Sequence, residues 1–563
     1  MESPIPNKIL TRNENKIPKL TALAAEKVAE VLDNLETIDE YIDLFRNMPT
    51  IYMKHVMKYL KLESYLKFIE KKGFEEFNNS KYWNKSLNNT SIYLRKLFAN
   101  DRDNPVLDDP KIDLIDVFED VTKFQQKPWD SYEMKIPKLM LFGLKKEMDD
   151  QPFVDSYEQF LRNFKIFTES QLDFINWDNV FIAGGAILAC LRKVPDEYNQ
   201  NMNTIRQYFH RISYKASDID IFIYGLNEKE ASEKVARLTK QIIENSIFAD
   251  DYSVYNSQNT VTIVSNWPFR HLQVILRLYK SPAEVLLGFD VDSCCVGFDG
   301  KKVYASPRFL RATTKRYNMV DLTRRSPSYE SRLLKYAHRG FCVAIPGFNQ
   351  SYVDEAIFQK GFHQVQGLAK LLLLDKFPNS EERKNHLIEL KRVYYRDYFA
   401  EKRKLGIKFD PNAFDLSRIF VPNKSRTNKV TDYESVYIPY GEGINFEANY
   451  ISRYYFGARS SLKRIHSNWF FYNSAKPKIY SYKGYRRQAF RRYFHNVESP
   501  VESRYNDSSF FGYSSYSIQQ KLSNLKNLNW ITENPGKQKL LSGSFQLPDC
   551  DEVEWFSSAY KLK

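Results

Sequence analysis

The fold class that this sequence predicts is α+β: a mixed sheet with flanking helices, between a helical N-terminal region and a loop-rich, basic C-terminal region. Two patterns indicate the sheet and its helices. In residues 217–224, isoleucines alternate with other side chains, which is the period of a β-strand. In residues 228–244, apolar residues recur at spacings of three and four, which is the period of an amphipathic helix. Such alternation of strand and helix around one sheet is typical of α+β domains.

The chain divides by composition into four regions. Residues 20–100 have helical spacing, and residues 101–136 are acidic and contain prolines, so we interpret the latter as a linker or a docking strap. Strands are predicted at 217–224, 260–264 and 271–278, and further helices at 329–338, 365–374 and 383–404. The predicted regions are 1–136 (helical, with the acidic stretch), 137–320 (the sheet), 321–423 (helical) and 424–563 (basic and aromatic).

Composition limits the class of protein. A chain of 563 residues is too long for one core, and its hydrophobic content of 43% is ordinary for a globular protein. No run approaches the ~18 apolar residues of a membrane helix, and the N-terminus has no signal-peptide pattern. Five cysteines form no Cys-x-x-Cys pair, which argues against a zinc site or a disulfide framework. We therefore expect an intracellular protein, cytoplasmic or nuclear, with no membrane span.

The most informative motif is Ser217-Asp218-Ile219-Asp220 in the first predicted strand. Successive strand side chains point to opposite faces, so Asp218 and Asp220 share one face. Two carboxylates about 7 Å apart suit divalent cations with oxygen ligands. Two such cations can clamp a triphosphate and lower the pKa of an attacking hydroxyl. The alternative is a solvated strand edge, but the apolar neighbours indicate a buried strand.

A glycine pair precedes this strand. Gly184 and Gly185 follow the apolar run 180–183 and open a short apolar segment that is predicted to be helical. Glycines at a helix N-terminus let backbone N–H groups approach a phosphate closely. The alternative is an ordinary turn. The glycine pair and the carboxylate pair in this order are more specific than either alone.

Together these motifs resemble the nucleotidyltransferase superfamily of DNA polymerase β, poly(A) polymerases and CCA-adding enzymes. The similarity is closer to a largely uncharacterised subgroup from fungi, other eukaryotes and large DNA viruses. Segments 277–284, 288–292, 321–330, 533–536 and 543–545 carry this second resemblance. It implies a nucleotidyltransferase fold for 137–320, with two Mg²⁺ (or Mn²⁺) as cofactors and a nucleoside triphosphate as partner. If the chain is viral, the virion or the host cytoplasm is its expected location.

The resemblance requires a third carboxylate on a neighbouring strand. The strand 271–278 carries Gln273 rather than an acid at its centre. We therefore predict Asp290, with Asp292 as the alternative, at the start of a strand that follows a short helix at 282–287. Another interpretation is that both acids belong to a surface turn. The chain also departs from compact superfamily members, because 32 residues separate Gly185 from Asp218 and are predicted to include an inserted loop and helix at about 193–214.

The resemblance also implies nucleotide contacts from Ser217 and from basic residues that follow the sheet. Arg324 and Arg325 are predicted to contact the nucleotide, and the helix after them carries Arg332 and Lys335. The alternative is that such residues pair with nearby acids, for which Asp321 is available.

The net charge of +14 is concentrated near the C-terminus. Residues 451–496 contain eleven Lys or Arg, no Asp or Glu, and thirteen aromatic residues. Cations bind phosphates and aromatic rings stack on unpaired bases, so single-stranded RNA is the predicted partner. The predicted contacts are the arginine pairs Arg486-Arg487 and Arg491-Arg492. The alternatives are an aromatic core with a solvated basic face, neutralisation by the acidic stretch 101–136, or contact with an anionic membrane or an acidic protein.

Three functions remain open from the sequence. The first is Mg-dependent transfer of a nucleoside monophosphate from a nucleoside triphosphate to an acceptor hydroxyl, in particular an RNA 3′ end. The second is the same chemistry on a protein or a small molecule. The third is a scaffold that keeps the nucleotidyltransferase fold without catalysis. The Asp218-Ile219-Asp220 motif argues against the third.

Overall fold

The fold was analysed in a computed structural model of the whole chain. The structure describes residues 20–34, 42, 45, 48–71, 73–141, 153–214, 217–246, 252–256, 260–265, 268–321, 324, 329–346, 348, 358, 367–377, 381–382, 385–386, 389, 430–431, 437–438, 522, 525 and 528–531. The chain forms two compact units, which are 1–96 with 129–135, and 97–128 with 136–563. The basic segment 451–496, with Arg486, Arg487, Arg491 and Arg492, lies outside the described residues, as does Arg325.

The first unit is helical, as the spacing of its apolar residues predicts. Its elements are α1 (Leu20–Leu32), α3 (Thr50–Val56), α4 (Leu62–Ile69), a 3₁₀ turn (Glu75–Phe77), the start of α5 (Ser80–Asn100) and α6 (Ser131–Lys135). Its core combines buried aliphatic residues with edge-on aromatic contacts that link Phe45, Phe68 and Phe74. The hydroxyl of buried Tyr65 donates to the carbonyl of Phe77 at 2.8 Å, which satisfies the polar atom inside this core.

The second unit is built on an eight-stranded mixed sheet with the order β1-β9-β8-β3-β4-β7-β6-β5. Its strands are β1 (Ile115–Asp116), β3 (Val180–Ala183), β4 (Ile219–Tyr224), β5 (Ser253–Asn256), β6 (Thr260–Val264), β7 (Leu272–Tyr279), β8 (Val296–Phe298) and β9 (Val303–Ala305). Among the strands that the structure describes in this sheet, β4 and β7 pair in parallel and the other neighbours are antiparallel. The α+β class is therefore confirmed.

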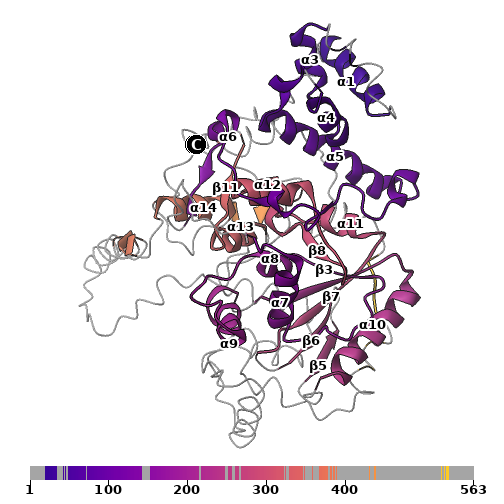
Figure 1. Cartoon of the computed structure of the whole chain (residues 1–563), viewed down its shortest axis with the longest axis vertical. Coiled ribbons are helices and arrows are strands. Elements are labelled where there is room, and N and C mark those ends of the chain that lie inside the picture. Colours follow the sequence, from indigo (N-terminus) through magenta and orange to yellow (C-terminus); the bar gives the residue numbers. More distant parts are fainter. Residues whose placement is uncertain are drawn as a thin grey trace, which may run out of the picture. The chain divides into compact units, whose positions relative to one another are not determined.

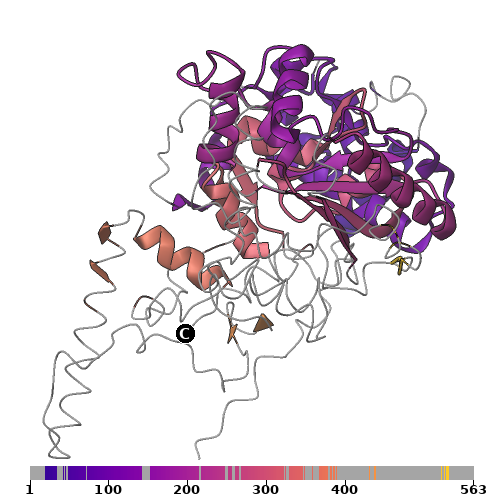
Figure 2. The same ribbon diagram turned by 90° about the horizontal axis from the view of Figure 1, so that it is seen from below.

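Helices cover this sheet and follow its strands in the chain. They are α7 (Tyr157–Thr168), α8 (Gly185–Leu191), α9 (Met202–Gln207) continued by a π-helix (Tyr208–Ser213), α10 (Glu228–Glu244), α11 (Pro282–Leu287) and α12 (Pro307–Lys315). Figure 1 shows the purple helices α7 and α8 side by side next to β3, and Figure 2 shows the purple and magenta helices and strands of this unit from below. The insertion predicted at 193–214 contains α9 and the π-helix.

The chain after the sheet continues with α13 (Tyr329–Ala337) and α14 (Gly367–Lys376). A smaller sheet with the order β10-β11-β2 joins β10 (Tyr317–Met319), β11 (Cys342–Ala344) and β2 (Lys138–Leu139), and β12 (Val430–Thr431) pairs with β13 (Tyr437–Ile438). None of the helices in the described part of the chain has the length and apolar character needed to cross a membrane.

The acidic stretch after residue 100 docks against the sheet as far as residue 128, rather than separating two domains. Ile115 and Asp116 pair with β9, and two 3₁₀ turns, at Pro105–Asp108 and Val121–Phe124, flank this strand. Arg102 forms two hydrogen bonds, of 2.7 and 2.9 Å, with the buried carboxylate of Glu284 in α11. Of the two interpretations of this stretch, its described contacts correspond to a docking strap.

Candidate functional site

The carboxylate pair lies where β3 ends and β4 begins. Asp220 is in β4, opposite Ala183 of β3 on one side and Gln273 of β7 on the other. Asp218 comes just before the strand, and the amide of Gln273 donates to its Oδ2 at 3.4 Å. Both aspartates are half-buried, between fully buried isoleucines. The β-period therefore holds two carboxylates together at one end of the sheet.

The electrostatics of Asp220 identify its neighbours. Removal from water and repulsion by Asp218 raise the pKa of Asp220 to about 6, whereas Lys335 and Arg332 act in the opposite direction. Both cations belong to α13, which follows the sheet in the chain. The carboxylate pair and the cations of α13 thus form one charged cluster.

Lys335 is the solvent-exposed member of this cluster. Its pKa is nevertheless lowered to about 8, because the surrounding protein displaces water and Arg339 repels the charge, while Asp218 and Asp220 act in the opposite direction. A side chain that keeps contact with solvent while protein crowds around it is accessible to a charged ligand.

The glycine pair is explained by backbone geometry and by side chains of the α13 segment. Gly184 has φ = +95°, a conformation that favours glycine, and its N–H donates to the carbonyl of Val296 at 2.8 Å. A Cβ on Gly185 would lie 2.8 Å from Nη1 of Arg339 and 2.9 Å from the hydroxyl of Tyr336. In this structure the pair therefore lets the chain turn and lets Arg339 and Tyr336 approach closely. The predicted phosphate contact of these glycines remains a prediction.

Asp290, the predicted third acid, is buried in an ion pair. Its Oδ1 lies 3.0 Å from Nη1 of Arg332, and only 1% of the residue is exposed. The prediction that Asp290 and Asp292 begin a strand is wrong. The backbone instead turns through the 3₁₀ helix Asp292–Cys294, with i→i+3 hydrogen bonds at Cys294 and Cys295, so that β8 begins at Val296.

Asp292 has a different set of partners. Its carboxylate accepts hydrogen bonds from Arg308 and Arg311, each at 2.8 Å, and from the N–H of Met319 at 3.1 Å. Burial alone would raise the pKa of Asp292, but Arg311 and Arg308 hold it below its usual value. Such a group joins α12 and β10 to the turn, which is a structural role.

The carboxylate pair meets part of what a divalent cation requires. Asp218 and Asp220 supply adjacent hard oxygen ligands, and a cation would relieve the repulsion that raises the pKa of Asp220. A third protein ligand is not assembled, since the described residues contain no group of three or more His, Cys, Asp or Glu that could hold a metal. The pair fits one divalent cation, and neither Asp290 nor Asp292 completes a three-carboxylate site in this structure.

The other predicted nucleotide contacts have structural partners. The carbonyl of Ser217 accepts a hydrogen bond from Arg270 at 2.9 Å. Arg324 is 4% exposed, its Nε donates to Asp321 at 3.0 Å, and its Nη1 donates to the carbonyl of Leu287. Arg324 therefore takes the alternative role of pairing with a nearby acid.

Sequence reasoning missed two arginines near the pair. Arg339 lies four residues after Lys335, so helical spacing could have indicated it. Arg270 precedes β7, and its only sequence signal is a charge beside an apolar strand. Its contacts come from segments far apart in the chain, which no local pattern can reveal.

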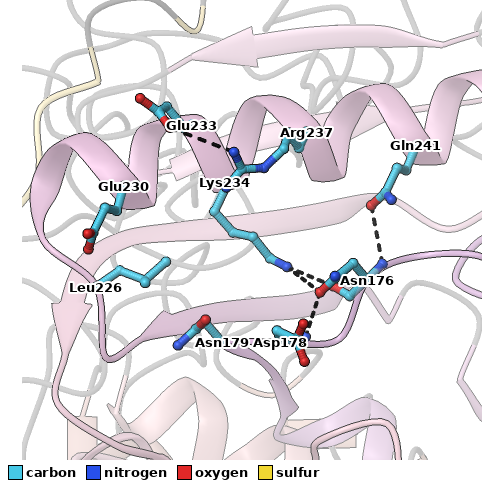
Figure 3. Close-up of a pocket in the computed structure, with 9 residues that line it drawn as sticks. All are labelled: Asn176, Asp178, Asn179, Leu226, Glu230, Glu233, Lys234, Arg237 and Gln241. Carbon is cyan, nitrogen blue, oxygen red and sulfur yellow. Dashed lines mark hydrogen bonds and ion pairs between the residues drawn. The ribbon is translucent and has the colours of Figure 1, made fainter.

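A separate cavity of about 460 Å³ lies at the opposite end of the same strands (Figure 3). It is lined by Asn176, Asp178, Asn179, Leu226, Glu230, Glu233, Lys234, Arg237 and Gln241. Lys234 reaches across it, and its Nζ donates to the carbonyl and to Oδ1 of Asn176 at 2.9 and 2.8 Å. At this end of the two strands Val180 of β3 pairs with Ile223 of β4, whereas Asp220 pairs with Ala183 at the other end. The side chains that line this cavity include both acidic and basic groups, whereas the pair at the other end consists of two carboxylates.

Comparison with known proteins gives two matches. Residues 155–316, which include β3, β4 and β7, match the family described as "Gabija anti-defense 2 family protein". The chain is also 29% identical over 425 residues to the uncharacterized protein R883 of Acanthamoeba polyphaga mimivirus, covering 69% of this chain and 84% of that protein. No solved structure matches. The family match covers less than a third of the chain, and it contains both aspartates of the pair.

Proposed function

We propose that the Asp218–Asp220 end of the large sheet binds a nucleoside triphosphate with a divalent cation and transfers its nucleoside monophosphate to an acceptor hydroxyl. The observation that carries the proposal is the meeting of two carboxylates with the cations of α13: Lys335 and Arg332 act on Asp220, and Asp218 and Asp220 act on Lys335, although burial and like charges shift the pKa of both groups the other way. Perturbed titratable groups of opposite sign at one accessible point are typical of functional sites.

The charge balance favours a metal–triphosphate complex over either component alone. Arg332 and Lys335 are three residues apart and share one side of α13, and Arg339, in the turn after the helix, is close enough to Lys335 to lower its pKa. These cations attract phosphate oxygens, while Asp218 and Asp220 repel them. A divalent cation held by the two carboxylates would turn this repulsion of the phosphate oxygens into attraction. A metal-bound triphosphate therefore suits both halves of the cluster.

The reaction that this arrangement supports is displacement at the α-phosphorus. A bound cation would supply Lewis-acid stabilisation of the phosphoryl oxygens. The acceptor oxygen forms a bond to the α-phosphorus, the bond to the bridging oxygen breaks, pyrophosphate leaves, and the hydroxyl proton passes to water. Lys335 and Arg339 would hold the leaving phosphates, and Asp218 and Asp220 would orient the reacting end.

The proposed acceptor is an RNA 3′ end, with a protein or a small molecule as the alternative. The support for RNA is the composition of residues 451–496, where eleven cations and thirteen aromatic residues occur without an acid. The name of the matched family adds a biological context, which is action against a host defence system. That context is compatible with each acceptor.

A second candidate is nucleotide binding without transfer. Two observations favour it: Asp290 is paired with Arg332, and the residue opposite Asp220 in β7 is the neutral Gln273. A site with only two carboxylates can hold a cation and a triphosphate yet lack a third acid to assist the acceptor hydroxyl. Both candidates include binding of the metal–triphosphate complex, but the first also includes transfer of the nucleoside monophosphate.

The full chain, incubated with Mg²⁺ and each α-³²P-labelled nucleoside triphosphate, with and without RNA, tests the proposal. Label transfer that is lost in Asp218→Asn and in Asp220→Asn is the expected result. Asp178→Asn is the matched control, because Asp178 lies at the other end of the same strands. Nucleotide binding with no transfer to RNA, protein or water would establish the second candidate, and transfer that survives in both site variants would contradict the proposed site.

A further inference from the structure

Arg270 is a buried arginine directly before β7, and its contacts converge on the segment that carries Asp218. Only 2% of the residue is exposed. Its guanidinium carbon stacks 3.8 Å from the centre of the Phe167 ring. Arginine is suited to such a place, because its planar fork offers five donors in fixed directions.

The guanidinium group donates to four main-chain carbonyls from three segments. Nε bonds the carbonyl of Phe167 at 2.9 Å, in the last turn of α7. Nη2 bonds Phe209 at 3.0 Å and Nη1 bonds Tyr214 at 2.8 Å, both in the insertion. Nη1 also bonds the carbonyl of Ser217 at 2.9 Å. One side chain thus joins α7, the end of the insertion and the residue before Asp218.

Two neighbours of Arg270 hold the next residues of the same segment. The carbonyl of His271 accepts the N–H of Ile219 at 3.0 Å. The amide of Gln273 donates to Asp218 at 3.4 Å. Residues 270, 271 and 273 therefore contact residues 217, 219 and 218, and the hydrogen bond of Arg270, at 2.9 Å, is the shortest of the three.

The insertion has a second anchor on Glu169, which follows α7. Nε of Arg206 lies 2.8 Å from Oε1 of Glu169, and Nε2 of His210 lies 2.8 Å from the same oxygen. The insertion is consequently held by two side chains, by Glu169 through Arg206 and His210 and by Arg270 through Phe209 and Tyr214. Movement of the insertion would be transmitted through Arg270 to the carbonyl of Ser217.

We infer that Arg270 is a positioning residue for the carboxylate pair, which fixes the direction of Asp218 and makes it depend on the insertion at 193–214. The inference rests on the proposed function, in which Asp218 and Asp220 hold a divalent cation. Residues that orient metal ligands from behind commonly affect metal affinity by about 10–100-fold when they are replaced.

The experiment measures Mn²⁺ binding to the full chain by electron paramagnetic resonance, together with urea unfolding. Arg270→Lys keeps the charge but removes the fork. Arg277→Lys is the matched control, since Arg277 is an equally buried arginine, within β7, that pairs with Glu284. Both variants are expected to unfold at lower urea concentration. Only Arg270→Lys should weaken Mn²⁺ binding, by about tenfold or more.

Arg206→Gln is a milder second variant, because Arg206 is partly exposed and pairs with Glu169 rather than with Arg270 or Ser217. It should lower Mn²⁺ affinity about threefold, as a loosened insertion pulls less firmly on Arg270. Unchanged affinity in Arg206→Gln would overturn the dependence on the insertion. Equal Mn²⁺ affinity in Arg270→Lys and in the unaltered chain would overturn the positioning role alone. An unaltered chain that binds Mn²⁺ no better than Asp218→Asn would overturn the proposed function and this inference together.

Discussion

Two Asp-x-Asp pairs in this fold have opposite environments. Asp218 and Asp220 repel each other at the start of β4, and the pKa of Asp220 is raised to about 6. Asp290 and Asp292 are almost fully buried and are neutralised by arginines, and the pKa of Asp292 is lowered. The first pair is destabilising unless a cation joins it, whereas the second holds the fold together. The same motif therefore serves binding in one place and structure in the other.

The largest effect should follow from Asp292→Asn. The change leaves Arg308 and Arg311 buried beside a neutral amide, so the free energy of unfolding should fall by about 3–5 kcal/mol. Urea unfolding of the full chain measures this loss. Asp116→Asn is the control, because Asp116 pairs with the largely exposed Lys302. A loss below 1 kcal/mol in Asp292→Asn would contradict the structural role of the second pair.

Asp290→Asn should have an intermediate effect. Arg332 is only partly buried and can turn toward solvent, so we expect a loss of about 2 kcal/mol in the free energy of unfolding. Mn²⁺ affinity should stay within about twofold, because metal affinity responds strongly only to ligands and to residues that orient them. A collapse of Mn²⁺ affinity with unchanged stability would instead make Asp290 the third metal ligand, as the sequence resemblance implies.

Asp220→Asn should raise the free energy of unfolding, whereas the two variants above lower it. The folded-state pKa, about 6, lies above the ordinary value of 3.8, so the ionised carboxylate destabilises the fold at neutral pH. The variant should be more stable at pH 7 by about 1–2 kcal/mol. In the unaltered chain this penalty should fade as the pH drops from about 6 to about 4, and the variant should lack that dependence. Urea unfolding of the unaltered chain and of the variant at pH 7 and pH 4.5 measures this difference in pH dependence.

Lys335→Gln should change stability least, by under about 0.5 kcal/mol, because the side chain is exposed. It should nevertheless weaken nucleoside triphosphate binding about tenfold in the presence of Mg²⁺, since one phosphate-binding charge is removed. Lys229→Gln on α10, another exposed lysine, is the control. Isothermal titration calorimetry with a non-hydrolysable nucleoside triphosphate measures the affinity of both variants. Equal affinities would separate α13 from the proposed site.

Much of the fold could be predicted from local pattern. The helix 228–244 and the strand 260–264 have the expected bounds, because amphipathic period and capping residues are local signals. Strand period also predicts that Asp218 and Asp220 lie near each other, and their carboxylates do interact, although Asp218 comes just before the strand. The ion pairs of Asp290 and Asp292 could not be predicted, since their arginines come from other helices. The docking of residues 97–128 was ambiguous, because acidic composition does not distinguish a linker from a strap.

The parallel pairing of β4 with β7 has a consequence for the order of folding. The chain between these strands forms α10, β5 and β6 before it returns, so about fifty residues must be closed into a loop before Asp220 meets Gln273. Local elements such as α10 can form in microseconds, whereas such long-range pairing is slow. The amide of Ile219, which bonds His271, should therefore gain protection from hydrogen exchange later than the amides of α10. Gln273 reaches Asp218 and Asp220 only when the sheet closes, so a chain without this pairing would carry the two carboxylates without their support from β7.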